Sequence, residues 1–426
     1  MKILDYTKQL FSKERRIYYD KVFWIAMIVL VILSMITMYS AGSQLAHKAI
    51  AHGVSHLSPF YSHVAFLLMG LVVAYFVQML PSWLIRGAAY ALLVFSIICL
   101  FLTFVPGLGV TINGARRWLR LGIVFQPSEL AKISLIIVAS DLLARMQGKE
   151  PKQRRKLLLW VLSLTVVICG VIMLSNLSTA LLLGAIVFIL MYLARVDWRV
   201  LGGIIMVAVM LLIGGYLIVE NVYIKPGREL TGPFSRATTW VSRIDRKVAS
   251  KKEEKTDTKL VINDSNRQEM CAKIAIARGS KTPLGVGPGN SKERDYLPLA
   301  FEDYIFAIYT EELGIVGAIV LIFFYLMILF RACTTSNRFD DHAAMLMVMG
   351  LGLMITLQAF VSMAVATGLG PVTGQPLPLF SRGGTGIIIA SVYFGIMMAV
   401  SREQNELKAQ SKAAEEESKR EEIIVM

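Results

Sequence analysis

The sequence contains few of the residues that build disulfide-stabilised domains or protein metal centres. Among its 426 residues are four cysteines and five histidines. The cysteines are scattered, three of them in or beside apolar runs, so their spacing indicates neither a disulfide framework nor a metal site. We expect the histidines in solvated loops, because none has a defensible ligand partner: His47, His52, His56, His63 and His342.

Charged residues are also scarce, at 17% of the chain, whereas 55% of the residues are hydrophobic. Apolar runs near the length that crosses a bilayer, about 20 residues, recur along the chain. This pattern predicts an all-α polytopic membrane protein with about ten transmembrane helices. The predicted spans are 23–41, 61–79, 87–105, 128–144, 157–174, 178–194, 200–219, 304–330, 344–366 and 385–400.

The distribution of basic residues predicts the orientation of the chain. Residues 1–22 are rich in Lys and Arg, and no convincing cleavage site follows the first apolar run, so we expect an uncleaved anchor. The positive-inside rule keeps this segment in the cytoplasm, and ten spans return the charged tail at 402–426 to the same side. Residues 23–401 then form the membrane domain. The net charge of +14 follows from this topology and from anionic lipid, and does not indicate nucleic-acid binding.

Two extracytoplasmic segments stand out before the eighth span. The first, at about 106–127, carries Arg116, Arg117 and Arg120 on the side where basic residues are normally scarce, which suggests a bound anion. The second is one large loop at about 221–302, far longer than usual, so we expect it to be functional, partly disordered, or both.

The two halves of this large loop differ in composition. Residues 251–257 and the surrounding insert at 245–262 are polar and predict a solvated segment without chemistry. A short helix is predicted at 265–278, followed by a glycine-rich run at 285–291. Glycine at this density permits either tight turns or a close approach of the backbone to a ligand.

A third outer segment, at 368–385, is rich in glycine and proline and is not expected to form a continuous helix. Such backbone is tolerated at membrane depth where it is buried in protein or wetted, so we expect it to re-enter the membrane or line a cavity. No twofold internal repeat is evident, which argues against a transporter.

An acidic and a basic residue lie near the start of the fourth predicted span. Glu129 precedes Lys132 by three residues, so on a helix they share a face and neutralise each other. Ionisable residues at this depth are functional candidates, although a structural ion pair is the alternative.

Several motifs together resemble one family of membrane proteins. They are Gly114 to Trp118, Phe125 to Lys132, Leu297 to Asp303, Glu311 to Gly314, and Pro371 to Thr385. In this order the chain resembles the SEDS family (shape, elongation, division and sporulation), the polytopic cell-wall synthases represented by FtsW and RodA. The resemblance extends from the first span to the tenth. The Gly-Ala-Arg-Arg-Trp form and the entry to the first span are more similar to the FtsW branch.

The resemblance implies a glycosyltransferase that polymerises lipid II at the outer face of the bacterial cytoplasmic membrane, here in cell division. It also implies a class B penicillin-binding protein as partner, with other divisome or elongasome membrane proteins. The family's essential outer-loop carboxylate falls on Asp303. The chain departs from common family motifs at 299–302, at Ser381 to Thr385, and after the fifth span, where Leu174 to Thr179 lacks the usual aspartate.

Joining two lipid-linked sugars requires a base for the attacking hydroxyl and positive charge for the departing diphosphate. Asp303, among aromatic neighbours that raise the pKa of a carboxylate by desolvation, suits the base, with Glu302 as a rival. Arg116 and Arg117 suit the diphosphate. The other candidate substrate-binding residues are Trp118, Glu129, Lys132, Thr373, Ser381 and Arg382.

No organic cofactor is expected. A divalent cation such as Mg²⁺ or Mn²⁺ would bind through a carboxylate and substrate phosphates, which needs no compact protein motif.

Two other functions are compatible with these features. A lipid II flippase would need the same diphosphate contacts without a base. A non-catalytic scaffold for the penicillin-binding protein would tolerate substitution of Asp303.

Overall fold

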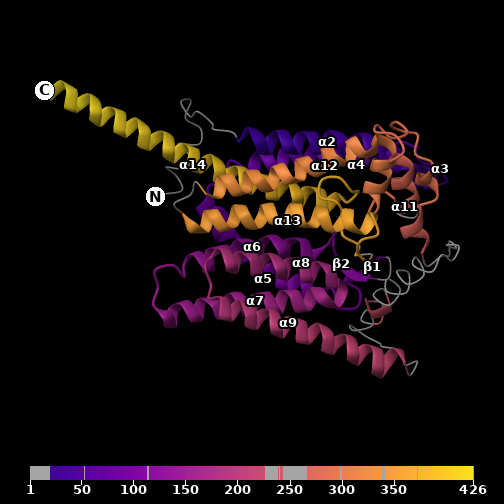
Figure 1. The fold of residues 1–426 in the computed structure, drawn as a ribbon, viewed down its shortest axis with the longest axis horizontal. Coiled ribbons are helices and arrows are strands. Elements are labelled where there is room, and N and C mark those ends of the chain that lie inside the picture. Colours follow the sequence, from indigo (N-terminus) through magenta and orange to yellow (C-terminus); the bar gives the residue numbers. More distant parts are fainter. Residues whose placement is uncertain are drawn as a thin grey trace.

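The computed structural model describes residues 20–51, 53–112, 115–225, 238, 240–242, 266–297, 300–337, 341–371 and 373–425. Within these ranges, ten long helices form one elongated bundle (Figure 1). They are α2 (Lys21–Ala41), α4 (Ser58–Val77), α5 (Ser82–Leu102), α6 (Pro127–Ala144), α7 (Pro151–Ser175), α8 (Leu177–Leu193), α9 (Trp198–Ile218), α12 (Ile305–Ser336), α13 (His342–Ala366) and α14 (Gly384–Val425).

The prediction of an all-α polytopic membrane protein is confirmed. Eight of the described helices are long and apolar enough to cross a membrane, and α8 is a shorter apolar helix of 17 residues. The remaining long helix, α6, carries three ionisable residues, Glu129, Lys132 and Asp141, yet it is mostly buried. All ten predicted spans therefore correspond to helices, in the predicted order.

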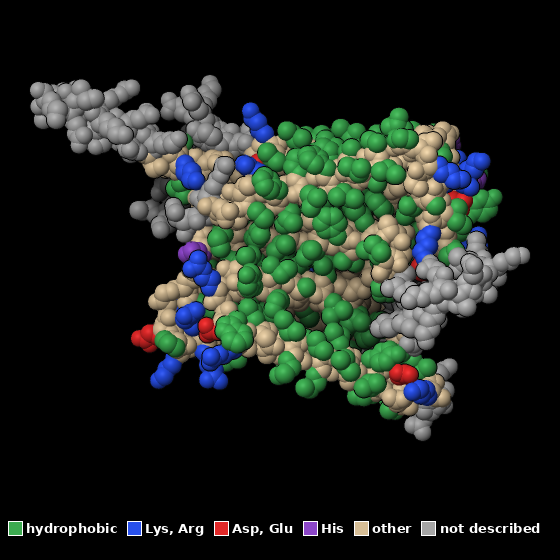
Figure 2. Space-filling view, in the orientation of Figure 1, with side chains coloured by type: hydrophobic (Ala, Val, Ile, Leu, Met, Phe, Trp, Pro, Cys, Tyr) green, Lys and Arg blue, Asp and Glu red, His purple; other side chains and the backbone are tan. Residues whose placement is uncertain are grey.

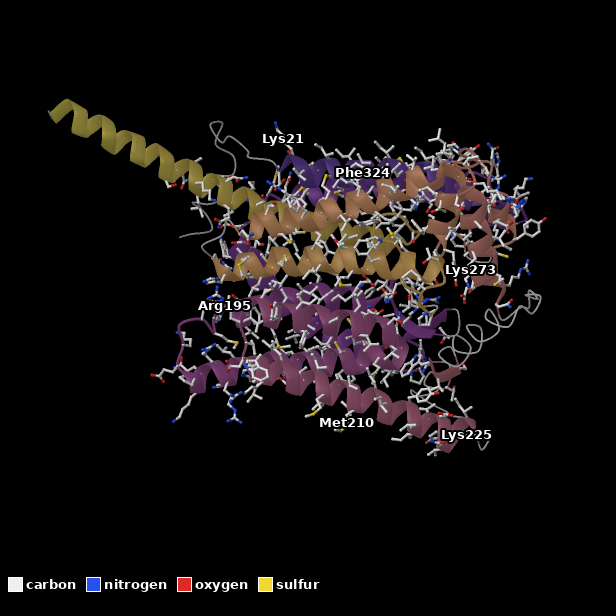
Figure 3. The ribbon with its side chains drawn as sticks, viewed as in Figure 1. Lys21, Arg195, Met210, Lys225, Lys273 and Phe324 are labelled. Atoms are coloured by element: carbon white, nitrogen blue, oxygen red, sulfur yellow. The ribbon has the colours of Figure 1, made fainter. Side chains whose placement is uncertain are left out.

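The surface of the bundle is apolar where a bilayer would surround it. Hydrophobic side chains cover its middle, and Lys and Arg gather towards the two ends (Figure 2). Met210 of α9, for example, is 65% exposed and points away from the bundle (Figure 3). A continuous apolar surface of this kind is unfavourable in water and marks contact with lipid. The chain is therefore a multi-pass membrane protein.

The two ends of the bundle differ in their contents. Lys21 and Arg195 lie at one end, and Lys225 and Lys273 at the other (Figure 3). At the first end, the Asp20 carboxylate accepts from Arg331 at 3.0 Å and from Ser401 at 2.6 Å, so α2, α12 and α14 meet there. The basic residues predict that this end is cytoplasmic. We call the opposite end the outer end.

The outer end carries most of the short elements. They are α3 (Ser43–Ala51), a sheet of order β1-β2-β3 made of β1 (Gly109–Ile112), β2 (Ala115–Leu121) and β3 (Ile123–Phe125), η1 (Val219–Ile224), α11 (Arg267–Gly279) and η3 (Glu293–Asp295). The predicted helix at 265–278 is confirmed as α11. The antiparallel strands and α3 were not predicted, because segments this short give little periodic signal.

Some predicted features lie outside the described residues. These are most of the cytoplasmic segment at 1–22, Gly114 of the arginine motif, Pro298 and Leu299, and the insert at 245–262. The proposed boundaries of the three chain regions stay predictions.

The glycine- and proline-rich segment between α13 and α14 is irregular, as predicted, and packed inside the protein. Leu377, Leu379 and Phe380 are at most 2% exposed. Tyr325 Oη donates to the Pro378 carbonyl at 2.6 Å, and Gln358 Nε2 donates to the Pro376 carbonyl at 2.9 Å. Side chains of the spans thus satisfy its backbone, which permits non-helical chain at this depth.

Candidate active site

Asp303 lies in a turn that immediately precedes α12 at the outer end. The irregular segment between α13 and α14 fixes this turn, because the Arg382 amide donates to the Phe301 carbonyl at 2.9 Å. Ser381 Oγ donates to the Glu302 carbonyl at 2.6 Å and accepts from the Leu377 amide at 2.8 Å. Ser381, 3% exposed, therefore has its hydroxyl engaged in fixing the position of Asp303.

Gly374 marks the point where Arg117 and Asp303 converge. A Cβ atom built on Gly374 would lie 3.6 Å from Arg117 Nη1 and 3.9 Å from Asp303 Oδ2. Gly374 has φ +65°, a left-handed conformation that favours glycine. The guanidinium and the carboxylate thus face the same small volume beside a glycine backbone.

The shape of β2 explains why Arg117 reaches this point. Val110 pairs with Trp118 and Thr111 with Arg116, so Arg117 is an extra residue opposite one step of β1. Such a β-bulge bends the strand and redirects a side chain. Arg116 has another environment, because its exposed Nη1 lies 3.5 Å from the Phe104 carbonyl at the end of α5. The structure brings Arg117, rather than Arg116, to Asp303.

Two carboxylates and two guanidinium groups share this site. Burial raises the pKa of Glu302, the charge of Asp303 raises it further, and Arg117 and Arg382 oppose the shift. Burial lowers the pKa of Arg382, and Glu302 opposes that change. The Arg382 guanidinium also lies over the Phe301 ring, 5.7 Å from its centroid. Charges held in partly buried surroundings interact more strongly than they would in water.

Three buried polar atoms in the predicted substrate-binding residues have no hydrogen-bond partner within the described part of the chain. They are Arg117 Nε, Trp118 Nε1 and Thr373 Oγ1. Buried donors without partners are destabilising and are usually satisfied by water or ligand. Arg117 Nε and Trp118 Nε1 are donors, and the Thr373 hydroxyl donates or accepts. Their chemistry fits an anionic ligand rich in oxygen.

Glu129 and Lys132 support the site from within the membrane. Lys132 Nζ is 2.8 Å from Glu129 Oε1, which confirms the predicted ion pair. Lys132 Nζ also donates to Gln358 Oε1 at 3.3 Å, and Gln358 in turn holds the Pro376 carbonyl. Because Lys132 is 0% exposed, its geometry favours a supporting role for the irregular segment.

One buried histidine–serine pair beside this segment was not predicted. His63 of α4 is 2% exposed, so the expectation of a solvated loop histidine is wrong for this residue. His63 Nε2 is 2.9 Å from Ser34 Oγ, which donates to the Phe380 carbonyl at 3.0 Å. The available signal was that His63 falls inside the predicted span 61–79.

The described residues contain no group of three His, Cys, Asp or Glu side chains that could hold a metal ion. Glu302 and Asp303 are the adjacent carboxylates at the site. One of them with substrate oxygens and water is the kind of shell that Mg²⁺ prefers, so the residues fit a substrate-bridged cation.

The sequence matches relatives over nearly its full length. Residues 20–406 match the pattern of the family FTSW_RODA_SPOVE, described as cell cycle proteins. A probable peptidoglycan glycosyltransferase FtsW from Geobacter sulfurreducens is 30% identical over 385 residues, which cover 90% of this chain and 95% of the relative. The protein of the same name from Nitrosomonas europaea is 30% identical over 381 residues, covering 88% and 90%.

Solved structures share the fold. A chain from a peptidoglycan synthase complex, described as coordinating polymerization and crosslinking, has a TM-score of 0.67 and 26% identity, and the match covers 91% of this chain and 98% of that one. The rod shape determining protein RodA of Thermus thermophilus has a TM-score of 0.61 and 23% identity over the same shares.

Proposed function

Because this chain belongs to the FtsW, RodA and SpoVE family of cell cycle proteins and is a peptidoglycan glycosyltransferase, we propose that the cluster around Asp303 and Arg117 polymerises lipid II. The observation that carries this proposal is the convergence of the Asp303 carboxylate and the Arg117 guanidinium beside Gly374. A base and a diphosphate-binding cation are the two groups that the reaction requires.

Asp303 acts on the attacking sugar. Its carboxylate accepts the proton of the acceptor hydroxyl while that oxygen forms a bond to the donor's anomeric carbon. The bond between this carbon and the diphosphate oxygen breaks, and the lipid diphosphate leaves as an anion. The turn that carries Asp303 is fixed by Ser381 and Arg382, which keeps the base at a constant position.

Arg117 acts on the leaving group. Its planar guanidinium presents several donors to phosphate oxygens, and its Nε is buried without a partner within the described chain. Arg382, half-buried beside Glu302, is a second cation for the same anion. Trp118 and Thr373 offer further donors to the sugar or phosphate oxygens.

A divalent cation, Mg²⁺ or Mn²⁺, is part of the proposal. Asp303 or Glu302 would hold it together with substrate oxygens, where it would supply additional positive charge to the diphosphate.

A class B penicillin-binding protein is the proposed partner, and cell division the proposed process. The likeness to a chain from a peptidoglycan synthase complex supports a partner of this kind. The similarity to FtsW relatives supports division over elongation.

The test is polymerisation of purified lipid II by the purified protein, with and without the partner. We expect Asp303→Asn to insert and fold normally and to lose glycan formation, because an amide does not accept the proton. Glu220→Gln is the control, since Glu220 is an outer carboxylate of η1 that pairs with Lys225 at 3.2 Å and lies outside the turn that carries Asp303.

Other outcomes would favour the other functions. Normal product from Asp303→Asn would remove this residue from the mechanism, and it would support a scaffold only if all product required the partner. Movement of labelled lipid II across vesicles without glycan formation would support a flippase.

A further inference from the structure

The span that follows Asp303 is not a continuous helix. Gly314 has φ 68° and ψ −164°, which breaks α12 into a short helix at 305–313, here called the half-helix, and a longer membrane helix. A side chain at Gly314 would clash with the carbonyl of Pro283. Asp303 lies two residues before the half-helix, so the orientation of this one element sets the position of the proposed base.

The outer loop holds the half-helix by its backbone. Residues 279–297, here called the strap, lie against the break. The Val286 amide donates to the Glu311 carbonyl at 3.0 Å, and the Gly287 amide donates to the Glu312 carbonyl at 2.9 Å. These carbonyls are at the end of the half-helix, where a helix leaves acceptors unsatisfied. The strap therefore caps the half-helix.

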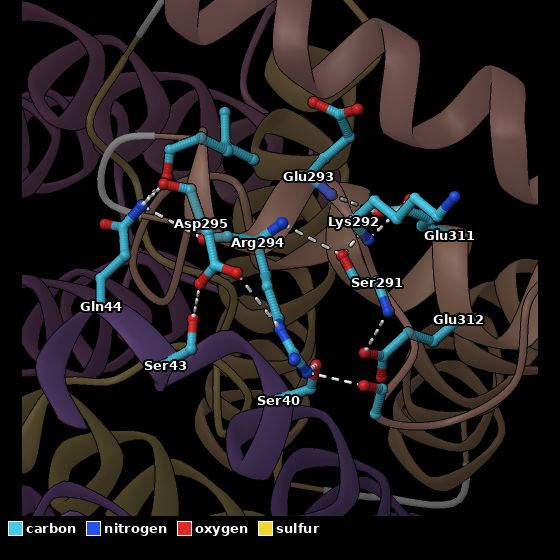
Figure 4. A network of polar contacts seen from close by, with 12 residues as sticks. Ser40, Ser43, Gln44, Ser291, Lys292, Glu293, Arg294, Asp295, Glu311 and Glu312 are labelled. Carbon is cyan, nitrogen blue, oxygen red and sulfur yellow. Dashed lines mark hydrogen bonds and ion pairs between the residues drawn. The ribbon is translucent and has the colours of Figure 1, made fainter. Parts of the chain in front are cut away.

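The Glu311 side chain adds a buried anchor between the two segments. It is 0% exposed and lies inside a polar network of the strap (Figure 4). Its carboxylate accepts from Arg278 Nη1 at 3.1 Å, from Ser291 Oγ at 2.5 Å, from the Lys292 amide at 3.2 Å and from the Glu293 amide at 3.4 Å. Four donors from outside α12 thus converge on one side chain of the half-helix.

The strap is in turn tied to the first span. Arg294 Nη1 donates to Ser40 Oγ at 3.2 Å and to the Gly289 carbonyl at 2.6 Å. Gln44 of α3 donates to the Leu297 carbonyl at 2.9 Å (Figure 4). The half-helix is therefore fixed against the strap, α2 and α3, and its outer turn is fixed separately by Ser381 and Arg382.

We propose that Glu311 is a positioning residue for glycan polymerisation: its buried carboxylate locks the half-helix to the strap and so aligns Asp303 with Arg117. This rests on the proposed function. Glu311 is fully buried and satisfied by four donors, so it acts through the half-helix and does not contact substrate. A buried ion pair stabilises a fold less than its geometry suggests, and its best-supported use is to fix one arrangement of two segments.

The first measurement is steady-state polymerisation by Glu311→Gln in the full-length protein with its partner. Because small misplacement of a catalytic group can lower the rate by about 100-fold, we expect kcat to fall by roughly 10- to 100-fold with little change in KM. Glu311→Asp should recover part of the rate. Glu220→Gln is the control, because Glu220 pairs with Lys225 at 3.2 Å on η1.

The second measurement is amide hydrogen exchange, which does not depend on activity. We expect Glu311→Gln to increase exchange across 305–313 and to leave the remainder of α12 protected. Ser291→Ala, which removes one donor and no charge, should show the same local change at smaller size. If Glu311→Gln fails to fold, Ser291→Ala carries the test.

The two measurements separate this inference from the proposed function. Unchanged exchange at 305–313 in the folded variants would overturn the role of Glu311. Increased exchange with a normal kcat would show that the anchor does not align the site, and would also overturn the positioning role. Normal glycan formation by Asp303→Asn would instead count against the proposed function.

Discussion

At the residue scale, Arg117 and Arg116 are chemically identical neighbours in different environments. Arg117 reaches Gly374 beside Asp303, whereas the exposed Arg116 reaches the Phe104 carbonyl. Because a hydrogen bond to a charged group contributes about 1.5–3 kcal/mol, Arg117→Ala should lower kcat/KM for lipid II by roughly 10- to 100-fold. Arg116→Ala should change it little. Equal losses in kcat/KM, or a matching loss of membrane expression for Arg117→Ala, would contradict a specific role.

The pair of carboxylates leads to a prediction about pH. Burial and Asp303 raise the pKa of Glu302, and the interaction is reciprocal, so each carboxylate disfavours ionisation of the other. In Glu302→Gln, Asp303, the proposed base, ionises beside a neutral amide, so no neighbouring negative charge opposes its ionisation. We therefore expect the acidic limb of the kcat/KM profile to move to lower pH. A shift to higher pH would contradict this electrostatic account.

The same shift has a consequence for stability. A carboxyl group whose pKa is raised in the folded state opposes folding as the pH rises from its ordinary pKa to the raised one. Glu302 should therefore lower the free energy of unfolding at pH values above its raised pKa. At pH values below its ordinary pKa it should leave the free energy of unfolding unchanged.

At the element scale, α6 depends on its internal ion pair. Lys132 is buried between Glu129 and Gln358, so Glu129→Gln leaves a buried ammonium without its counter-charge. Breaking a buried pair on one side costs about 3–5 kcal/mol, whereas replacing both partners with apolar groups is often neutral. We expect Glu129→Gln to lower Tm in detergent, and Glu129→Leu with Lys132→Met to restore much of it. A double variant less stable than the single would show that the pair itself stabilises α6.

The broken helix α12 is an element that sequence periodicity predicts only in part. Its apolar length predicts a span, and the Glu-Glu-Leu-Gly motif gives no sign of a break. The left-handed φ at Gly314 arises because the strap approaches closely there.

At the scale of the whole molecule, the proposed site and the strap lie at the outer end of the bundle. The first and last described residues of the chain lie at the opposite end of the bundle (Figure 1). An extracytoplasmic partner can contact the strap directly, so we expect the penicillin-binding protein to raise the polymerisation rate of the wild type. The assay compares initial rates with and without the partner. An unchanged rate would mean that the partner acts only after polymerisation.

Local features of the sequence predict the ten helices, the short α11, the irregular segment before α14 and the ion pair between Glu129 and Lys132. Each is a local property, because the length of an apolar run, the density of glycine and proline, and a spacing of three residues act within one stretch of chain. Family motifs added Asp303 and the arginine pair.

Which of these side chains meet depends on how separate segments of the chain pack together. The meeting of Arg117, Gly374 and Asp303, the burial of His63 against Ser34, and the anchor at Glu311 each join separate segments of the chain, whereas the bulge at Arg117 arises within one short hairpin. Contacts of this kind depend on how separate helices and loops pack, and a local sequence pattern does not determine which of them come together.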